Sequence, residues 1–375
     1  MRACQYDADS PAGVKLTEDV RKPIRSRSHA LIRVHAAGVN PVDAKFIIGD
    51  KLPESWMAWA ARRATGHTPG FDFSGVVTDI EPINAAGLSI GDEVFGFACN
   101  PAHFVLRPCS SLHGSFAEYI AAPINQIAKK PQALTHTEAA ALPLVGTTAL
   151  QAFSQHQLRK GQRLLVIGAS GGVGHVAVQV ATHLGVHVTA VCSSKNVVFV
   201  EECGASVVLS YDDGDIFAKI GADAATNGAY DLCFDCVSSA DARDTNASYA
   251  ARLRTMQPRV LRKGPGVDAH NYVVLGGATG SWATALVKRF LKINCFPKGF
   301  ELFWIKMPGA HRVLAQLAAL ADAPDSDSNR PKPLRPKVDS RLAFSEVAAR
   351  EAFEALRGRR TAGKIVMEIA QSEPL

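Results

Sequence analysis

The sequence predicts an α/β protein in which a doubly wound parallel sheet occupies the middle of the chain and an antiparallel, barrel-like domain precedes it. Three observations predict this class. Short β-branched runs broken by Gly and Pro fill residues 1–130, apolar runs alternate with amphipathic stretches from about 160 to 280, and a glycine-rich turn follows the first of those later runs. A chain of 375 residues is long enough for two such domains.

Each strand expected in the first domain is a β-branched or aromatic run bounded by turn residues. The predicted strands are Ala30–Val34, Gly75–Ile80, Glu93–Phe97 and Phe116–Ala121. The segment Leu52–Thr65 interrupts this pattern with two tryptophans and two arginines, which predicts a helical insertion. We expect its aromatic side chains to add to the core.

A helix is expected to begin at Glu138, and strands and helices alternate beyond it. The predicted strands are Arg163–Gly168, His187–Cys192, Ser206–Ser210, Tyr230–Cys236 and Asn271–Gly276. Helices are predicted between the first three of these strands, at Gly172–Leu184 and Asn196–Cys203. This alternation is typical of a parallel sheet with crossover helices.

The last part of the chain contains further elements. The pattern predicts a helix at Ala310–Ala321, a surface loop over 322–337, a strand at Val338–Phe344, a helix at Val347–Leu356 and a final strand at Gly363–Ile369. We expect this final apolar strand to return to the sheet of the first domain. The predicted parallel-sheet domain is therefore 131–299, and the barrel-like domain combines 1–130 with 300–375.

Composition and charge exclude several classes of function. Hydrophobic residues make up 47% of the chain and charged residues 20%, and the net charge of +6 is spread along the sequence, so no nucleic-acid partner is predicted. A positive cleft for an anionic ligand is the weaker alternative. Eight cysteines without a secretory signal predict reduced thiols in the cytoplasm. No apolar run reaches the roughly 18 residues of a membrane span.

A glycine turn follows the strand that begins at Arg163, within the run Val166–Val176. Gly168 suits a tight turn, Gly171 lets the backbone approach a pyrophosphate, and Gly174 permits close contact between helix and sheet. The helix N-terminus adds free N–H groups and a positive dipole. Strand, turn, helix and second strand follow in order, which predicts a Rossmann-type dinucleotide site. The predicted cofactor contacts are Ala169, Ser170, Gly171, Gly172, Val173 and Gly174.

The end of the second strand predicts NADPH as the cofactor. Sites for NAD carry a carboxylate about 20 residues after the turn, where it binds the ribose 2′-hydroxyl. The segment Val191–Asn196 carries no carboxylate. Ser193 can hydrogen-bond a 2′-phosphate there, and Lys195 can neutralise it. Tyr211, after the third strand, is expected to close over the adenine ribose.

Short motifs occur in a fixed order along nearly the whole chain. They are Ala36–Asp43, Pro69–Val77, Gly91–Val94, Gly114–Tyr119, Ala139–Pro143, Gly146–Ala149, the glycine turn and Gly363–Val366. This ordered set resembles the medium-chain dehydrogenase/reductase superfamily, in its quinone oxidoreductase branch. The insertion at Leu52–Thr65 is similar to that of reticulon-4-interacting-protein-like members. The resemblance implies a GroES-like β-barrel domain made from both chain ends, a Rossmann domain between them, an active site in the cleft between the domains, and a homodimer.

The resemblance also bears on zinc. Zinc-dependent relatives carry Cys where this chain has Asn40 and His where it has Phe71, and neither replacement is a zinc ligand. The relatives' lobe of four closely spaced cysteines is missing, because Cys99 and Cys109 alone cannot fill a tetrahedral site. The pair in Cys233–Cys236 lies on a predicted strand, where side chains three apart point to opposite faces, so we expect core cysteines. No metal is therefore implied.

Without a metal, the hydride acceptor must need little polarisation. A quinone or an α,β-unsaturated carbonyl fits, because the charge left after hydride delivery delocalises. The resemblance implies that Asn40 lies beside the nicotinamide as a catalytic and cofactor-binding residue. It also implies that Thr147 faces the ring, that Gly276 and Gly277 pass beneath it, and that Lys364 lies near the cofactor or the domain seam. A turn role for Asn40 and a surface role for Lys364 are the alternatives.

The proton donor stays open at this point. Enoyl-thioester reductases of the superfamily carry a Tyr shortly after the position of Gly49, where this chain has Asp50 and Lys51. Lys51 is the catalytic candidate and His67 a second one, with a solvated or structural role as the alternative for each. The sequence is therefore interpreted as an NADPH-dependent, zinc-independent quinone or enone oxidoreductase. A trans-2-enoyl-thioester reductase and a noncatalytic NADPH-binding scaffold are the alternatives.

Overall fold

The structure, a computed structural model, describes residues 1–7, 9–10, 13–45, 65–84, 86–98, 113–238, 249, 252–253, 255–256, 258–262, 271–276, 301–303, 305–325, 331–359 and 361–369. The chain divides into two compact units. Unit 1 comprises Met1–Thr147, Lys306–Ala323 and Arg335–Leu375, and unit 2 comprises Thr148–Ile305 and Pro324–Leu334. The predicted insertion Leu52–Thr65 lies outside the described residues except for Thr65.

Unit 2 is built on a parallel sheet. Its strands are β8 (Arg163–Ile167), β9 (His187–Cys192), β10 (Val207–Ser210), β11 (Leu232–Asp235), β12 (Tyr272–Val274) and β13 (Glu301–Leu302). Every neighbouring pair is parallel, in the order β10-β9-β8-β11-β12-β13. The predicted doubly wound sheet is confirmed, with β13 as an additional edge strand. The strand order reverses beside β8, and ligands of such sheets bind at the carboxyl end of this switch point.

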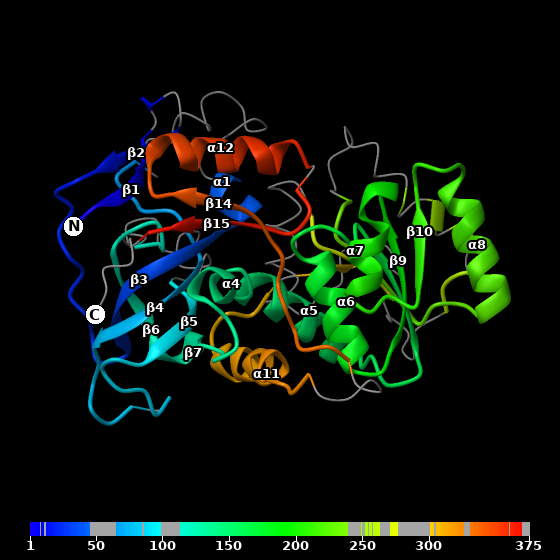
Figure 1. Cartoon of the computed structure of the whole chain (residues 1–375), viewed down its shortest axis with the longest axis horizontal. Coiled ribbons are helices and arrows are strands. Elements are labelled where there is room, and N and C mark those ends of the chain that lie inside the picture. Colours follow the sequence, from blue (N-terminus) through cyan, green and yellow to red (C-terminus); the bar gives the residue numbers. More distant parts are fainter. Residues whose placement is uncertain are drawn as a thin grey trace. The chain divides into compact units, whose positions relative to one another are not determined.

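Helices connect these strands (Figure 1). They are α6 (Gly174–His183), η2 (Ser194–Asn196), α7 (Val197–Glu202) and α8 (Ile216–Asn227). α6 packs against β8 and β9, while α7 and α8 both contact β10. The two predicted helices are confirmed, each shorter by one or two residues at its ends. α8 is an addition, and its N-cap Asp215 accepts a hydrogen bond from the backbone N–H of Phe217.

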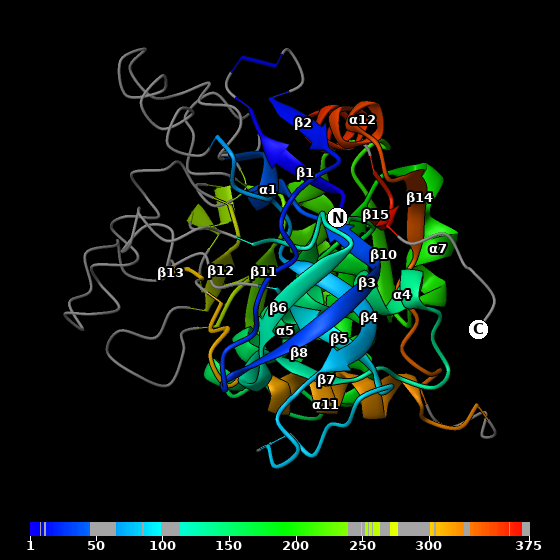
Figure 2. The same cartoon turned by 90° about the vertical axis from the view of Figure 1, so that its left-hand side faces the viewer.

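Unit 1 is built on a mainly antiparallel sheet in the order β14-β15-β3-β4-β5-β7, with β6 also paired to β3 (Figure 2). Its strands are β3 (His29–Val39), β4 (Asp72–Asp79), β5 (Glu93–Phe97), β6 (Tyr119–Pro123), β7 (Ile127–Lys129), β14 (Val338–Ala343) and β15 (Lys364–Glu368). β15 pairs antiparallel with Ala36–Val39 of β3, which confirms the return of the final strand. Pairing with β15 on one side and with β4 on the other explains why β3 continues past its predicted end at Val34.

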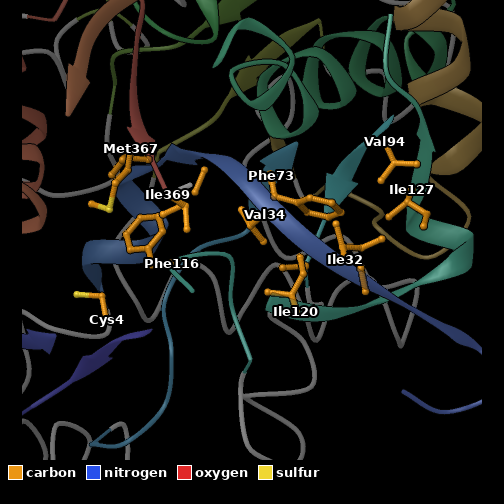
Figure 3. Close-up of a cluster of buried hydrophobic side chains, with 14 of the residues drawn as sticks. Cys4, Ile32, Val34, Phe73, Val94, Phe116, Ile120, Ile127, Met367 and Ile369 are labelled. Carbon is orange, nitrogen blue, oxygen red and sulfur yellow. The ribbon is translucent and has the colours of Figure 1, made fainter. Parts of the chain in front are cut away.

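A hydrophobic core fills one side of this sheet (Figure 3). Ile32 from β3, Phe73 from β4 and Met367 from β15 belong to one buried cluster. The helix α12 (Glu346–Arg357) adds Phe353 to the same cluster and contacts β2, β14 and β15. Both ends of the chain therefore contribute to one core.

Short elements complete unit 1. They are β1 (Ala3–Tyr6), β2 (Val14–Thr17), α1 (Pro41–Lys45), η1 (Ile124–Gln126), α4 (His136–Ala140) and α11 (His311–Ala321). α4 begins with a capping box between Thr135 and Glu138. The following helix α5 (Pro143–Gln155) begins in unit 1 and ends in unit 2. In the part of the chain that the structure describes, no helix is both long and apolar enough to cross a membrane.

Candidate functional sites

The glycine turn joins β8 to α6, as predicted. Gly168 has a φ of 76°, and a Cβ there would overlap the side chain of Val237. A Cβ on Gly174 would overlap the carbonyl oxygen of Gly168 and the backbone of Ala169. The fold itself therefore requires these two glycines, the first for a left-handed turn and the second for the close approach of α6.

Gly171 differs from both of them. Among the described residues, a Cβ on Gly171 would meet one atom within 4 Å, the carbonyl oxygen of Gly168 at 3.4 Å. The backbone N–H groups of Gly172 and Val173 donate no hydrogen bond to any described residue. Since the fold does not need a glycine at position 171, its open face leaves room for a pyrophosphate at the start of α6. The residues present therefore fit a dinucleotide.

The segment after β9 is fixed to the glycine turn. Nδ2 of Asn196 donates hydrogen bonds to Oγ of Ser170 at 3.1 Å and to Oγ of Ser193 at 3.0 Å. Ser193 is buried, whereas Lys195 is exposed and forms no ion pair with a described residue. Tyr211, just after β10, is 49% exposed. The structure thus brings Ser170 and Ser193 together and leaves the ammonium group of Lys195 available.

Unit 1 holds a buried polar cluster of Asn40, Asp43, Asp72 and Lys364. Nζ of Lys364 donates to Oδ1 of Asn40 at 2.6 Å and lies 3.6 Å from Oδ2 of Asp72. Nδ2 of Asn40 donates to Oδ2 of Asp72 at 3.0 Å and to the carbonyl oxygen of Gly38 at 3.3 Å. The backbone N–H of Asn40 donates to Oδ2 of Asp43 at 2.7 Å. Every polar atom of the Asn40 side chain is therefore engaged within unit 1.

Strand register assembles this cluster. Asp72, the first residue of β4, lies opposite Gly38 of β3. Ile365 of β15 lies opposite Val39, so the preceding Lys364 reaches the end of β3, where its Nζ also donates to the carbonyl oxygen of Val39 at 3.1 Å. Two separate strand pairings thus meet at the corner where β3 turns into α1.

Burial governs the protonation of the cluster. It raises the pKa of Asp43 to about 8 and the pKa of Asp72 to about 6, against the opposing effect of the Lys364 charge. Burial also lowers the pKa of Lys364, while the two carboxylates raise it. One lysine therefore faces two buried carboxyl groups. Burial thus favours the neutral form of Asp43, while the Lys364 charge opposes the same effect of burial on the pKa of Asp72.

The other predicted residues belong to separate segments of the two units. Thr147 in α5 is fully buried, and its Oγ1 has no hydrogen-bond partner in the described part of the chain, so a polar ligand atom could satisfy it. Gly276 lies two residues beyond β12. The carbonyl oxygen of His67 accepts a hydrogen bond from a backbone N–H of β1. Gly277 and Lys51 lie outside the described residues.

The positions relevant to zinc hold poor ligands. Phe71 presents a buried phenyl ring. Cys233 on β11 and Cys236 just after it are unpaired, and burial raises the pKa of both thiols well above the ordinary value. Cys99 and Cys109 lie outside the described residues. Over the residues that the structure does describe, no group of three or more His, Cys, Asp or Glu side chains could hold a metal ion.

Sequence reasoning missed three carboxylates. Asp43 and Asp72 lie inside motifs that the sequence analysis singled out, but neither had an assigned role. An ionisable residue at the start of an apolar strand was the available signal for Asp72. Asp212, after β10, accepts from the backbone N–H of Ser194 at 2.6 Å and from its Oγ at 2.9 Å. No local pattern marks Asp212, because only the pairing of β9 with β10 brings the two residues together.

Comparisons with known proteins cover most of the chain. Residues 26–132 match the alcohol dehydrogenase GroES-like domain, and residues 172–254 match the zinc-binding dehydrogenase family. The human mitochondrial NAD(P)H oxidoreductase RTN4IP1 is 27% identical over 380 residues, covering 95% of this chain and 86% of the relative. The trans-enoyl reductase pgmF of Aspergillus terreus is 28% identical over 399 residues, covering 99% and 97%. The solved quinone oxidoreductase from Coxiella burnetii is 25% identical with a TM-score of 0.71, covering 99% of each chain.

Proposed function

We propose that this chain transfers hydride from NADPH to a quinone or an α,β-unsaturated carbonyl, without zinc. The chain belongs to the medium-chain dehydrogenase/reductase superfamily, in its quinone oxidoreductase branch. The observation that carries the proposal is the open face of Gly171 beside two backbone N–H groups without partners in the described chain. The names of the relatives support the acceptor class, since they include a quinone oxidoreductase and a trans-enoyl reductase.

The choice of NADPH over NADH is supported by the segment after β9. Ser193 lies against the glycine turn through Asn196 and can donate a hydrogen bond to a 2′-phosphate. The exposed ammonium group of Lys195 has no carboxylate partner among the described residues, so it is available to neutralise that phosphate. Tyr211 adds an exposed ring at the end of the next strand.

The zinc-independent part of the proposal is supported by side-chain chemistry. Zinc requires thiolate, imidazole or carboxylate ligands. At the positions where zinc-dependent relatives carry Cys and His, this chain has the fully engaged amide of Asn40 and the phenyl ring of Phe71. An acceptor that delocalises its own negative charge is therefore the class that these residues suit.

The chain's own residues then have separate tasks. When bound, the nicotinamide cofactor supplies the hydride. The N–H groups of Gly172 and Val173 bind the pyrophosphate. The hydroxyl of Thr147, which has no hydrogen-bond partner among the described residues, binds a polar ligand atom. Asn40 and Lys364 hold the corner after β3 in place through their buried hydrogen bonds. Lys51 stays the candidate hydrogen-bond donor to the acceptor.

Steady-state turnover tests this proposal. The purified full chain is expected to oxidise NADPH in the presence of 9,10-phenanthrenequinone or an enone, followed as loss of absorbance at the reduced-nicotinamide band. A dialysis against a strong chelator should leave the rate unchanged. Tight NADPH binding without turnover over a broad panel of acceptors would contradict the proposal and favour a noncatalytic NADPH-binding scaffold.

Reduction of a trans-2-enoyl thioester is the second candidate function. The similarity to the trans-enoyl reductase pgmF along 99% of this chain favours it. It predicts NADPH oxidation with a crotonyl thioester at a rate comparable to that with simple enones. No turnover of the thioester, alongside turnover of the quinone, would exclude this candidate and leave the first one standing.

Replacing Lys195 with glutamate is expected to weaken NADPH binding by about 1–3 kcal/mol and to leave NADH binding nearly unchanged, because the variant replaces a partner of the 2′-phosphate with a repelling charge. Isothermal titration calorimetry measures both affinities. Lys160→Glu is the matched control, since Lys160 is exposed and precedes β8, whereas the glycine turn and Lys195 follow the carboxyl ends of β8 and β9. An equal loss of affinity for both cofactors in the Lys195 variant would contradict the assignment.

The proposal includes a cytoplasmic location and a homodimeric assembly. The location is supported by the five described cysteines, none of which forms a disulfide, as expected in a reducing compartment. The homodimer is supported by the family resemblance. The partner class is a small-molecule quinone or enone, with no nucleic acid.

A further inference from the structure

The carboxylate of Asp212 contacts the segment after β9, which we propose binds the 2′ position of the cofactor ribose. Oδ2 of Asp212 accepts hydrogen bonds from the backbone N–H of Ser194 at 2.6 Å and from Oγ of Ser194 at 2.9 Å. Asp212 follows β10, whose last residue Ser210 lies opposite Cys192, the last residue of β9. Asp212 is exposed, and no described residue donates a hydrogen bond to its Oδ1. One oxygen of this carboxylate is therefore available to a ligand.

Ser194 is connected to the glycine turn through its neighbours. Ser193 precedes it and Asn196 follows it, and Nδ2 of Asn196 joins Ser193 to Ser170 of the turn. Asp212 thus contacts the same short segment that the proposed dinucleotide site uses to bind the adenosine ribose. Lys195 follows Ser194 directly in that segment, so the carboxylate and the ammonium group belong to the same proposed ribose-binding region.

The chemistry of a carboxylate at this place is specific. In dinucleotide sites for NAD, a carboxylate at the end of the second strand accepts a hydrogen bond from the ribose 2′-hydroxyl. This chain lacks that residue, but Asp212 brings an equivalent group from the end of the next strand to Ser194. A carboxylate accepts from a 2′-hydroxyl and repels a 2′-phosphate. Its effect therefore opposes that of Lys195.

We infer that Asp212 limits the preference for NADPH and allows the chain to bind NADH as well, by accepting a hydrogen bond from the ribose 2′-hydroxyl. This inference rests on the proposed dinucleotide site and adds a second cofactor to it. Asp212 is then a specificity-determining residue, with Lys195 and Ser193 favouring the phosphorylated ribose and Asp212 favouring the free one.

Binding measurements on the full chain test the inference without relying on turnover. Isothermal titration calorimetry gives the affinities for NADPH, NADH, 2′,5′-ADP and 5′-AMP. The wild type is expected to prefer NADPH over NADH by less than about tenfold. Asp212→Asn keeps an oxygen that can accept from Ser194, and it should raise the ratio of NADPH affinity to NADH affinity by about tenfold. The ratio for 2′,5′-ADP over 5′-AMP should rise similarly.

Asp213→Asn is the matched control. It removes the same charge from the adjacent exposed residue, which has no hydrogen-bond partner in the described chain, and should change either ratio by less than about twofold. The gain from Asp212→Asn should shrink when the salt concentration rises to about 0.5 M, because screening weakens a charge effect.

The outcomes separate this inference from the proposed function. If Asp212→Asn shows the same affinity ratios as Asp213→Asn, the inference is overturned and the proposed cofactor stands. A gain that does not shrink in salt also overturns it. Failure of the wild type to bind either dinucleotide overturns both the inference and the proposed cofactor. Binding of both dinucleotides without turnover of any acceptor overturns the proposed activity alone.

Discussion

Replacing Gly171 with valine should abolish dinucleotide binding and leave the fold of unit 2 intact. A Cβ at this position would meet no described atom closer than 3.4 Å, so the free protein has room for a branch at this carbon. The same side chain would occupy the space that a pyrophosphate needs. We expect NADPH affinity to fall by roughly 100-fold or more, while the free energy of unfolding changes by less than about 1 kcal/mol. Calorimetry and urea denaturation measure the two quantities.

The neighbouring turn position provides the contrast. Valine at Gly174 would overlap the backbone of Gly168 and Ala169, so it should lower the free energy of unfolding markedly. Loss of binding in the Gly171 variant together with an equally large loss of stability would mean that the glycine serves the fold. Retained binding in the folded variant would refute the assignment of the turn.

Replacing Lys364 with methionine should destabilise the chain by about 3–5 kcal/mol at pH 8, because it leaves the buried Asp72 carboxylate without its cation. The loss of folding free energy should depend on pH. Burial already raises the pKa of Asp72 from an ordinary value of 3.8 to about 6 with the lysine present, and the pKa should rise further without it. A folded-state pKa above the unfolded value contributes stability at low pH that is lost as the pH rises through it. The deficit relative to wild type should therefore grow from pH 5 to pH 8.

Urea denaturation at the two pH values measures this effect. The double variant Lys364→Met with Asp72→Asn should recover more than half of the lost stability at pH 8, because neither charge is then stranded. Lys129→Met is the control, since Lys129 is exposed on β7 and its ion pair with Asp92 contributes little. An equal deficit at both pH values, with no recovery in the double variant, would mean that lost packing is the cause.

Much of the fold could be predicted because its signals are local. Glu93–Phe97 and His187–Cys192 are strands over the very residues that the sequence pattern predicted. Elements that depend on residues far away in the sequence were harder to predict. β3 was predicted to end early, since its last residues are held by pairing with β15 and with β4, both distant in sequence. α8 was missed because Gly221 interrupts a weak helical pattern, and the helix is stabilised by its cap and by burial of Ile216 and Ile220.

The two candidate sites also differ in whether their residues are close together or far apart in the sequence. The glycine turn lies within a few consecutive residues, so the sequence predicted its position and its ligand class together. The polar cluster combines Asn40 with Lys364, and their contact arises from strand register between the two ends of the chain. The sequence identified both residues through the family resemblance. Of the two carboxylates that complete the cluster, Asp43 lies three residues after Asn40, whereas the contact of Asp72 with Asn40 depends on the pairing of β4 with β3.

The pairing of β15 with β3 also determines when the chain can finish folding. Lys364 and Val39 are separated by 325 positions, so the sheet of unit 1 closes only after all of unit 2 has been synthesised. Pairings over such separations form slowly, because the entropy of closing the loop opposes them until the contacts are made. The strands of unit 2 are complete by Leu302 and need none of the later strands. During synthesis, the edge of Ala36–Val39 that later pairs with β15 therefore stays unpaired, and an unpaired strand edge can associate with other chains.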